Sequence, residues 1–144
     1  QVINKKALAM AKNAQEKSIL LRYEILNLFG GLYVDTDLVC LRAFDCLNKS
    51  IELFAGIASS DKQSPVSDRL IGAISHHPII KECIYTLRHG MNLNRSPNLL
   101  TSCFIRSGYQ QKGSLVPFPA YFFFAKKNTI TDNTFAIQSE HSEF

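Results

Sequence analysis

The sequence predicts an α/β domain, and three observations support this prediction. Residues 5–29 have the spacing of one long helix. A short apolar, β-prone segment at residues 32–34 follows directly after Gly30 and Gly31. Further along the chain, runs typical of strands are mixed with runs that have helical spacing. We therefore expect helices packed against a sheet in which residues 32–34 form the central strand.

Length and composition are those of one ordinary globular domain. The chain has 144 residues, of which 46% are hydrophobic and 19% are charged, and this length suffices for a hydrophobic core. Its net charge of +4 comes from 16 Lys and Arg against 12 Asp and Glu. Because the basic residues are scattered, the sequence does not suggest nucleic-acid binding. No apolar run reaches the roughly 18 residues of a transmembrane helix, and no signal peptide is recognisable.

The four cysteines form neither a disulfide framework nor a metal-binding motif. Cys40, Cys46, Cys83 and Cys103 show no C-x-x-C spacing. This pattern favours reduced, mostly buried thiols, as in a cytoplasmic protein.

The helix predicted over residues 5–29 begins in a segment rich in Ala and Lys, which are good helix formers. Apolar or small side chains then recur at spacings of three and four. They predict a buried face formed by Ala14, Ser18, Leu21, Ile25 and Leu28. Arg22 lies one turn beyond Ser18, so these two side chains are neighbours. Gly30 supplies a left-handed C-cap, and Gly31 lets the chain turn tightly into the strand.

The rest of the chain predicts shorter elements. We expect strands at residues 38–41, 51–57 and 135–137, an aromatic β-prone region at 115–125, helical segments at 43–49, 69–75 (N-capped by Asp68), 79–89 and 97–107, and a loop at 59–67. His76 and His77 precede one of these helices. Adjacent side chains point apart and no further ligand lies at a recognisable spacing, so a structural role is favoured over a metal site.

Asp35 and Asp37 are the candidate functional residues, because they follow the short buried strand directly. Side chains two residues apart on extended backbone point the same way. The two carboxylates can therefore converge on one hard cation, which prefers oxygen ligands and keeps places for substrate phosphates. The alternative is a simple Asp-Thr-Asp turn whose carboxylates accept hydrogen bonds from local amides.

This stretch resembles the sugar-binding DXD region of the glycosyltransferases related to family 32. That group includes yeast mannosyltransferases, bacterial capsule enzymes and, more distantly, the clostridial glucosylating toxins. Its pattern reads roughly Ser-Asp-x-x-Arg-Tyr-x-x-Leu, a short gap, then Gly-Gly-x-Tyr-x-Asp-x-Asp. The matching residues are Ser18, Arg22, Tyr23, Leu26, Gly30, Gly31, Tyr33, Asp35 and Asp37.

The resemblance implies a GT-A-type fold, a Rossmann-like α/β domain whose first β-α units hold the nucleotide base. No strand is predicted before residues 5–29, and the chain starts on Gln1 rather than on Met. We therefore expect residues 1–144 to be a single domain that forms the C-terminal part of a glycosyltransferase catalytic domain and lacks its N-terminal nucleotide-binding strands.

The resemblance also implies a function, namely metal-dependent transfer of a sugar from a UDP- or GDP-sugar donor to a glycan or protein acceptor, with retention of configuration. Mn²⁺ or Mg²⁺ would neutralise charge on the diphosphate leaving group. By this resemblance Asp37 coordinates the metal, and Asp35 contacts the metal or the hydroxyls of ribose and sugar. Arg22 binds sugar hydroxyls or phosphate, Ser18 contributes to the substrate site, and Tyr33 lies beside the nucleotide. We expect Asp35, Asp37 and Arg22 to be catalytic. We expect the protein to be cytoplasmic, or to be a secreted effector that acts in the cytosol of a host cell.

Ile19 is the main departure from this pattern, which has Asp at that position. Ile cannot accept a hydrogen bond, so one sugar contact is lost and Arg22 must find another anion. Asp35 and the donor phosphate are the candidate partners. We therefore expect altered sugar recognition with a competent metal-diphosphate site.

The C-terminal tail departs as well. Gln138 and Ser139 replace histidines that close over the metal and diphosphate in the related enzymes, and Phe144 stands in place of a tryptophan. These departures favour an alternative function, a catalytically lapsed glycosyltransferase-like binding or interaction module. A third alternative, a phosphate-handling hydrolase, would need additional acidic ligands that the sequence does not place.

Overall fold

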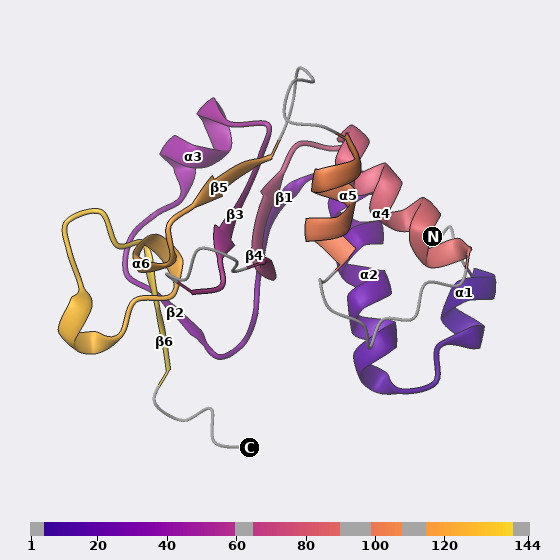
Figure 1. Ribbon diagram of the computed structural model, residues 1–144, viewed down its shortest axis with the longest axis horizontal. Helices are drawn as coiled ribbons and strands as arrows, with labels where there is room; N and C mark the ends of the chain where they lie inside the picture. The colour runs from indigo at the N-terminus through magenta and orange to yellow at the C-terminus, as the bar shows by residue number, and fades with distance from the viewer. Residues whose placement is uncertain (1–4, 60–64, 90–98, 108–114, 140–144) are drawn as a thin grey trace.

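The computed structural model describes residues 5–59, 65–89, 99–107 and 115–139. Its elements in chain order are α1 (Lys5–Met10), α2 (Ala14–Phe29), β1 (Gly31–Val34), β2 (Leu38–Cys40), α3 (Asp45–Ser50), β3 (Leu53–Ile57), β4 (Val66–Ala73), α4 (Pro78–Arg88), α5 (Leu99–Ser107), β5 (Val116–Phe118), α6 (Ala120–Phe123), the 3₁₀ turn Lys127–Thr129 and β6 (Ala136–Gln138). The predicted α/β class is confirmed, and a small sheet flanked by helices fits part of a GT-A-type domain (Figure 1). The expected start of a helix at Pro97 and the tail residue Phe144 lie outside the described residues.

The main sheet has four strands in the order β1-β4-β3-β5. The central strand β4 pairs antiparallel with β1 and β3, whereas β5 runs parallel to β3. β1 therefore lies at one end of the described strand order, and the prediction that it is central was wrong. The reason is β4, which occupies the central place although residues 69–75 were predicted to be helical. A separate antiparallel pair, β2 and β6, lies beside this sheet (Figure 1).

Helices cover both faces of the sheet (Figure 1). Neighbouring positions of a strand point to opposite faces, so Leu53 and Ile71 face the core under α2, α4 and α5, while Phe54 and Leu70 face an aromatic core under α6. Phe123 of α6 is fully buried against Phe54 and its neighbours. The aromatic segment therefore contributes to the core, although its second half forms a helical turn rather than the β structure expected from the sequence.

The long helix predicted over residues 5–29 is two helices, because the chain breaks at residues 11–13. Asn13 caps α2, and its Oδ1 accepts a hydrogen bond from the N–H of Glu16 at 2.9 Å. An Asn cap satisfies N–H groups that a continuous helix would have used internally, which explains the break.

The face of α2 that packs inward is not the predicted one. Leu20, Tyr23 and Leu26 are buried, whereas Ile25 is 54% exposed. Ala14 and Ser18, two other members of the predicted stripe, are exposed as well. Both stripes have helical spacing, and contacts with α4 select the one that carries Tyr23 and Leu26.

Gly30 connects α2 to β1 in a conformation with φ 64° and ψ −160°. This backbone region is almost restricted to glycine. A Cβ at this position would lie 2.7 Å from the backbone N of Ser75 and 2.8 Å from the carbonyl O of Ala73. Gly31 also has a positive φ, 101°, but a Cβ there would meet nothing within 4 Å. The predicted helix end is thus confirmed, but the predicted left-handed cap was wrong, because ψ of −160° lies outside the left-handed helical region. Close backbone packing adds a second reason for glycine.

His77 has the structural role expected from the sequence. Its fully buried ring accepts a hydrogen bond at Nδ1 from the N–H of Ile79, which caps α4, and Pro78 begins that helix. All four cysteines are free, but only Cys83 and Cys103 are buried, so the expectation of mostly buried thiols was half right. Among the described residues, no helix has the length and apolar character needed to cross a bilayer.

Replacing Gly30 and Gly31 by alanine, one at a time, separates the cost of backbone strain from the cost of close backbone packing. Gly31→Ala should lower the free energy of unfolding by about 1–2 kcal/mol, because only the backbone is strained. Gly30→Ala should lower it by at least about 1 kcal/mol more, because the new methyl group also meets the backbone of β4 and Ser75. Urea unfolding followed by circular dichroism measures both, and equal losses would contradict the close packing at Gly30.

Candidate functional site

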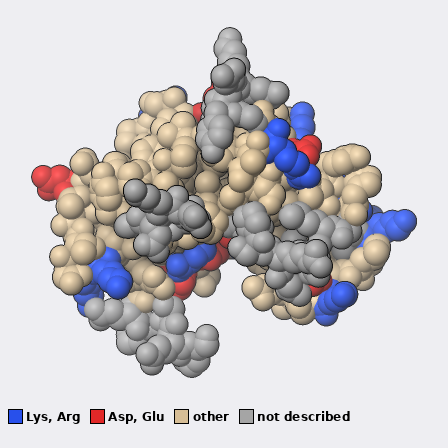
Figure 2. All heavy atoms as spheres, viewed as in Figure 1, with Lys and Arg blue, Asp and Glu red and all other residues tan. Residues whose placement is uncertain are grey.

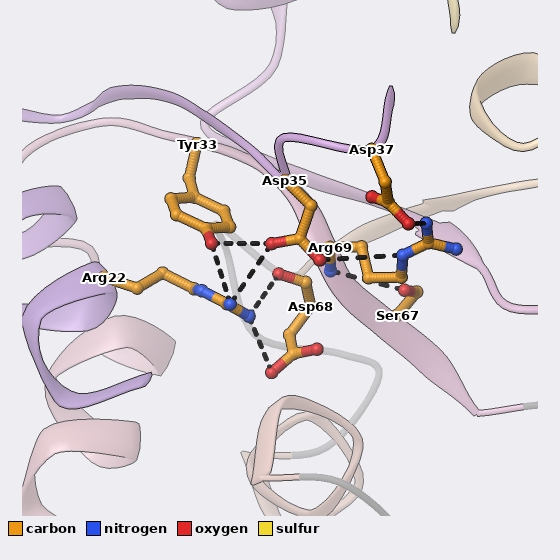
Figure 3. A network of polar contacts seen from close by, with 7 residues as sticks. All are labelled: Arg22, Tyr33, Asp35, Asp37, Ser67, Asp68 and Arg69. Atoms are coloured by element: carbon orange, nitrogen blue, oxygen red, sulfur yellow. Dashed lines mark hydrogen bonds and ion pairs between the residues drawn. The ribbon is translucent and has the colours of Figure 1, made fainter. Parts of the chain in front are cut away.

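Asp35 and Asp37 lie in the connection from β1 to β2, where the main sheet meets the β2–β6 pair (Figure 3). The N–H of Asp35 donates to the carbonyl of Arg69 on β4 at 2.8 Å. The carbonyl of Asp37 accepts from the N–H of Ser139, also at 2.8 Å. Both carboxylates are therefore carried by a backbone that is fixed from two sides, and this is the rigid platform a binding site requires.

Arg69 is a site residue that the sequence did not reveal. Its guanidinium bridges both candidate metal ligands, with Nε 3.6 Å from Asp35 Oδ2 and Nη2 in contact with Asp37 Oδ2. Its own N–H donates to the hydroxyl of Ser67. Asp35 directly follows β1, and its N–H donates to the carbonyl of Arg69, so the two residues lie opposite each other just beyond the β1–β4 pairing. Side chains of such opposite residues interact directly. Recognising residues 66–73 as a strand would have been needed to find it.

Arg22 connects α2 to β1 and β4. Nη2 donates to the hydroxyl of Tyr33 at 2.8 Å and lies 3.3 Å from Asp35 Oδ1 (Figure 3). Nη1 lies 2.9 Å from Asp68 Oδ2 and donates to the carbonyl of Asp68 at 2.7 Å. The side chain is only 8% exposed, so a buried cation is compensated by two carboxylates, as its burial requires.

Asp68 supplies the second anion that Ile19 does not. The expectation that Arg22 turns to Asp35 is confirmed, but Asp68 was missed because it was expected to cap a helix. Ile19 itself is partly buried and packs against the core under α2. Arg22 therefore retains two carboxylate partners despite the departure from the family pattern.

Tyr33 connects Arg22 to Asp35. Its hydroxyl donates to Asp35 Oδ1 at 2.6 Å, and its ring lies 4.1 Å from the guanidinium carbon of Arg22. Burial raises the pKa of Tyr33 above its ordinary value, and the hydrogen bond to Asp35 raises it further, while Arg22 opposes these effects. Tyr33 thus remains a protonated donor that fixes one oxygen of Asp35.

Ser18, Arg22 and Tyr33 line one cavity of about 460 Å³ between α2 and β1. The remaining lining is mostly apolar and includes Leu21 and Ile25, which belong to the outward face of α2. Asp35 and Asp37 are not among the lining residues. The structure therefore brings the predicted site residues into two adjoining groups, a cavity and a carboxylate pair, which meet at Arg22 and Tyr33.

The carboxylates themselves are half-buried, with exposed fractions of 26% for Asp35 and 32% for Asp37. On the face seen in Figure 2, acidic and basic atoms lie side by side in a notch between the strand-rich and helix-rich halves. A mixed charged surface of this kind suits a ligand that carries both phosphate and metal.

The carboxylate pair can be tested against a divalent cation. Asp37 Oδ1 is buried and has no hydrogen-bond partner among the described residues. The hydrogen bonds and ion pairs found for the carboxylates of Asp35 and Asp37 in the described part of the chain go to other side chains, although the backbone between them forms a turn in which the N–H of Leu38 donates to the carbonyl of Asp35 at 3.1 Å. No cluster of three or more His, Cys, Asp or Glu suited to a metal occurs in the described ranges. Two carboxylates that leave places for phosphates and water fit Mg²⁺ or Mn²⁺.

The two tail positions lie close to this pair. Gln138 ends β6 and pairs with Leu38 of β2. The N–H of Ser139 donates a hydrogen bond to the carbonyl of Asp37. The segment that carries histidines in the related enzymes is therefore adjacent to the carboxylates in this chain also, but it brings an amide and a hydroxyl.

Fold and site together define a small α/β domain with a DXD carboxylate pair, and comparisons with known proteins agree. Residues 2–53 match the family described as a glycosyltransferase sugar-binding region containing a DXD motif. The predicted resemblance to DXD-containing glycosyltransferases is thus confirmed, without singling out family 32.

Two curated relatives are yeast enzymes. The mannosyl phosphorylinositol ceramide synthases SUR1 and CSH1 of Saccharomyces cerevisiae (strain ATCC 204508 / S288c) are 34% and 36% identical over 76 residues, which is 51% of this chain. The matched regions span 18% and 19% of the length of these relatives. No solved structure gives a significant match.

The hydrogen bond from Tyr33 to Asp35 predicts a linked titration. In Asp35→Asn the pKa of Tyr33 should fall, because a negative neighbour and a strong acceptor are removed while Arg22 remains. NMR of ¹³C-labelled tyrosine measures this pKa, and Asp132→Asn, which alters an exposed turn residue, is the control. An unchanged Tyr33 titration in Asp35→Asn would contradict the contact.

Proposed function

We propose that this chain is part of a metal-dependent glycosyltransferase that uses a nucleotide-sugar donor. The observation that carries the proposal is the carboxylate pair after β1. Asp37 has a buried oxygen with no partner among the residues that the structure describes, and Asp35 is held by Arg22 and Tyr33. The match of this region to DXD-containing sugar-binding regions supports the same function.

Asp37, through Oδ1, and Asp35, through Oδ2, would hold Mn²⁺ or Mg²⁺. When bound, the ion neutralises negative charge that develops on the diphosphate leaving group. Arg22 acts mainly as a positioning residue, because its contacts with Tyr33, Asp35 and Asp68 leave it only 8% exposed. Direct contact of Arg22 with sugar or phosphate stays a prediction.

The cavity lined by Ser18, Arg22 and Tyr33 is the proposed place for the nucleoside or sugar part of the donor. Its apolar lining and few polar groups are typical of small-molecule sites. Both curated relatives are mannosyl phosphorylinositol ceramide synthases, which supports mannosyl donors as the first to test. UDP- or GDP-linked donors, a glycan or protein acceptor and retention of configuration remain parts of the proposal.

A catalytically lapsed binding module is the second candidate function, and Arg69 favours it. Its guanidinium pairs with both carboxylates, so the site is charge-compensated without a metal. Ile19, Gln138 and Ser139 point the same way. Donor hydrolysis discriminates the two candidates, since a lapsed module binds the donor without cleaving it. The hydrolase alternative lacks support, because the third carboxylate nearby, Asp68, is paired with Arg22.

Asp37→Asn tests the enzyme proposal. Mass spectrometry of UDP- and GDP-sugars incubated with the protein and Mn²⁺ should show slow donor hydrolysis in the wild type, reduced at least about a hundredfold in the variant. The stability loss should stay below about 1 kcal/mol, because the ion pair with Arg69 is partly exposed. Asp132→Asn should keep the wild-type rate. Equal rates in wild type and Asp37→Asn would remove Asp37 from the metal site.

A further inference from the structure

The further inference concerns Arg69, which contacts both carboxylates that would hold a cation. Its Nε and Nη2 face Asp35 Oδ2 and Asp37 Oδ2, one oxygen of each carboxylate (Figure 3). The other oxygens differ. Asp35 Oδ1 accepts hydrogen bonds from Arg22 and Tyr33, while Asp37 Oδ1 has no hydrogen-bond partner among the described residues.

Charge balance explains why Arg69 takes this position. The network contains three carboxylates (Asp35, Asp37 and Asp68) and two guanidiniums (Arg22 and Arg69), which leaves one net negative charge. Without Arg69 the three carboxylates would face Arg22 alone, and the stronger repulsion between half-buried carboxylates would raise the free energy of the folded state.

Addition of a divalent ion would change the charge of this network from net negative to net positive. A cation held by Asp37 Oδ1 and Asp35 Oδ2 would face the positive charge of Arg69 at close range, so the ion and the guanidinium repel each other and compete for Asp35 Oδ2. A bound diphosphate brings negative charge to the same place, and the planar guanidinium suits phosphate as well as carboxylate.

We infer that Arg69 is a built-in counter-ion of the carboxylate pair, which a divalent ion displaces and which then binds the phosphate of the donor. The inference rests on the proposed function, because it concerns the same metal site. Arg69 can move, because its side chain is 29% exposed, whereas that of Arg22 is 8% exposed. The ring of Phe124, which follows α6, lies 5.6 Å from the guanidinium carbon of Arg69.

The displacement predicts opposite effects of one substitution on two ligands. In Arg69→Gln, Mn²⁺ alone should bind at least about tenfold more tightly than in wild type, because competition for the carboxylates is removed. At saturating Mn²⁺, inorganic pyrophosphate should bind about tenfold more weakly, because its guanidinium ligand is missing. Electron paramagnetic resonance of free Mn²⁺ measures the first affinity, and calorimetry measures the second.

Arg42→Gln is the matched control, because it removes the same charge from an exposed arginine that packs on Phe135 outside the network. Both affinities should equal those of wild type. Arg69→Lys keeps the charge but cannot bridge two carboxylates with a planar fork, so its Mn²⁺ affinity should lie between those of wild type and Arg69→Gln.

The outcomes separate this inference from the proposed function. If wild type and Arg69→Gln bind Mn²⁺ equally, the metal site stands and the role of Arg69 is wrong. If neither binds Mn²⁺ at millimolar concentration, the metal site fails and the inference fails with it. Should the variants not fold, the NMR resonance of the Arg69 Nε–H group in the wild type tests the inference instead. It should shift with Mg²⁺ in proportion to site occupancy, and a resonance that does not respond while Mg²⁺ binds would overturn the inference.

Discussion

The buried guanidinium of Arg22 connects the helix and the strands that form the candidate site. Arg22 comes from α2, and it reaches Tyr33 and Asp35 at the end of β1 and Asp68 in β4. A charge that is 8% exposed is tolerable only if its partners stay in place. The need to satisfy Arg22 therefore fixes the helix relative to both strands, and it orients the carboxylate that lies beside the cavity.

Local signals in the sequence predicted the parts of the fold that local physics decides. Gly30 ends α2 because its backbone conformation is almost restricted to glycine, and His77 with Pro78 begins α4. The spacing of Asp35 and Asp37 after a short strand was sufficient to find the carboxylates. The extended backbone expected between them was wrong, because Thr36 and Asp37 form a turn in which the N–H of Leu38 donates to the carbonyl of Asp35 at 3.1 Å. The short spacing still brings both carboxylates to Arg69.

Long-range pairing decided the rest. Asp68 and Arg69 are polar and follow the loop predicted at residues 59–67, so the sequence suggested a capped helix where the structure has the central strand β4. As a result, Asp68 and Arg69 could not be foreseen as partners of Arg22 and Asp37, more than 30 residues away in the sequence. The choice between two apolar stripes on α2 likewise depends on α4, which the helix sequence does not specify.

The position of a bound Mn²⁺ tests the central claim, that Asp35 and Asp37 form a divalent-cation site, most directly. The chain of 16.2 kDa suits amide NMR, and a paramagnetic ion broadens signals only near itself. Sub-stoichiometric Mn²⁺ should erase the amide signals of residues 35–37 and 67–69 first and spare those of α3. Broadening centred elsewhere, such as at Glu24 and Glu82 in the groove between α2 and α4, would contradict the account.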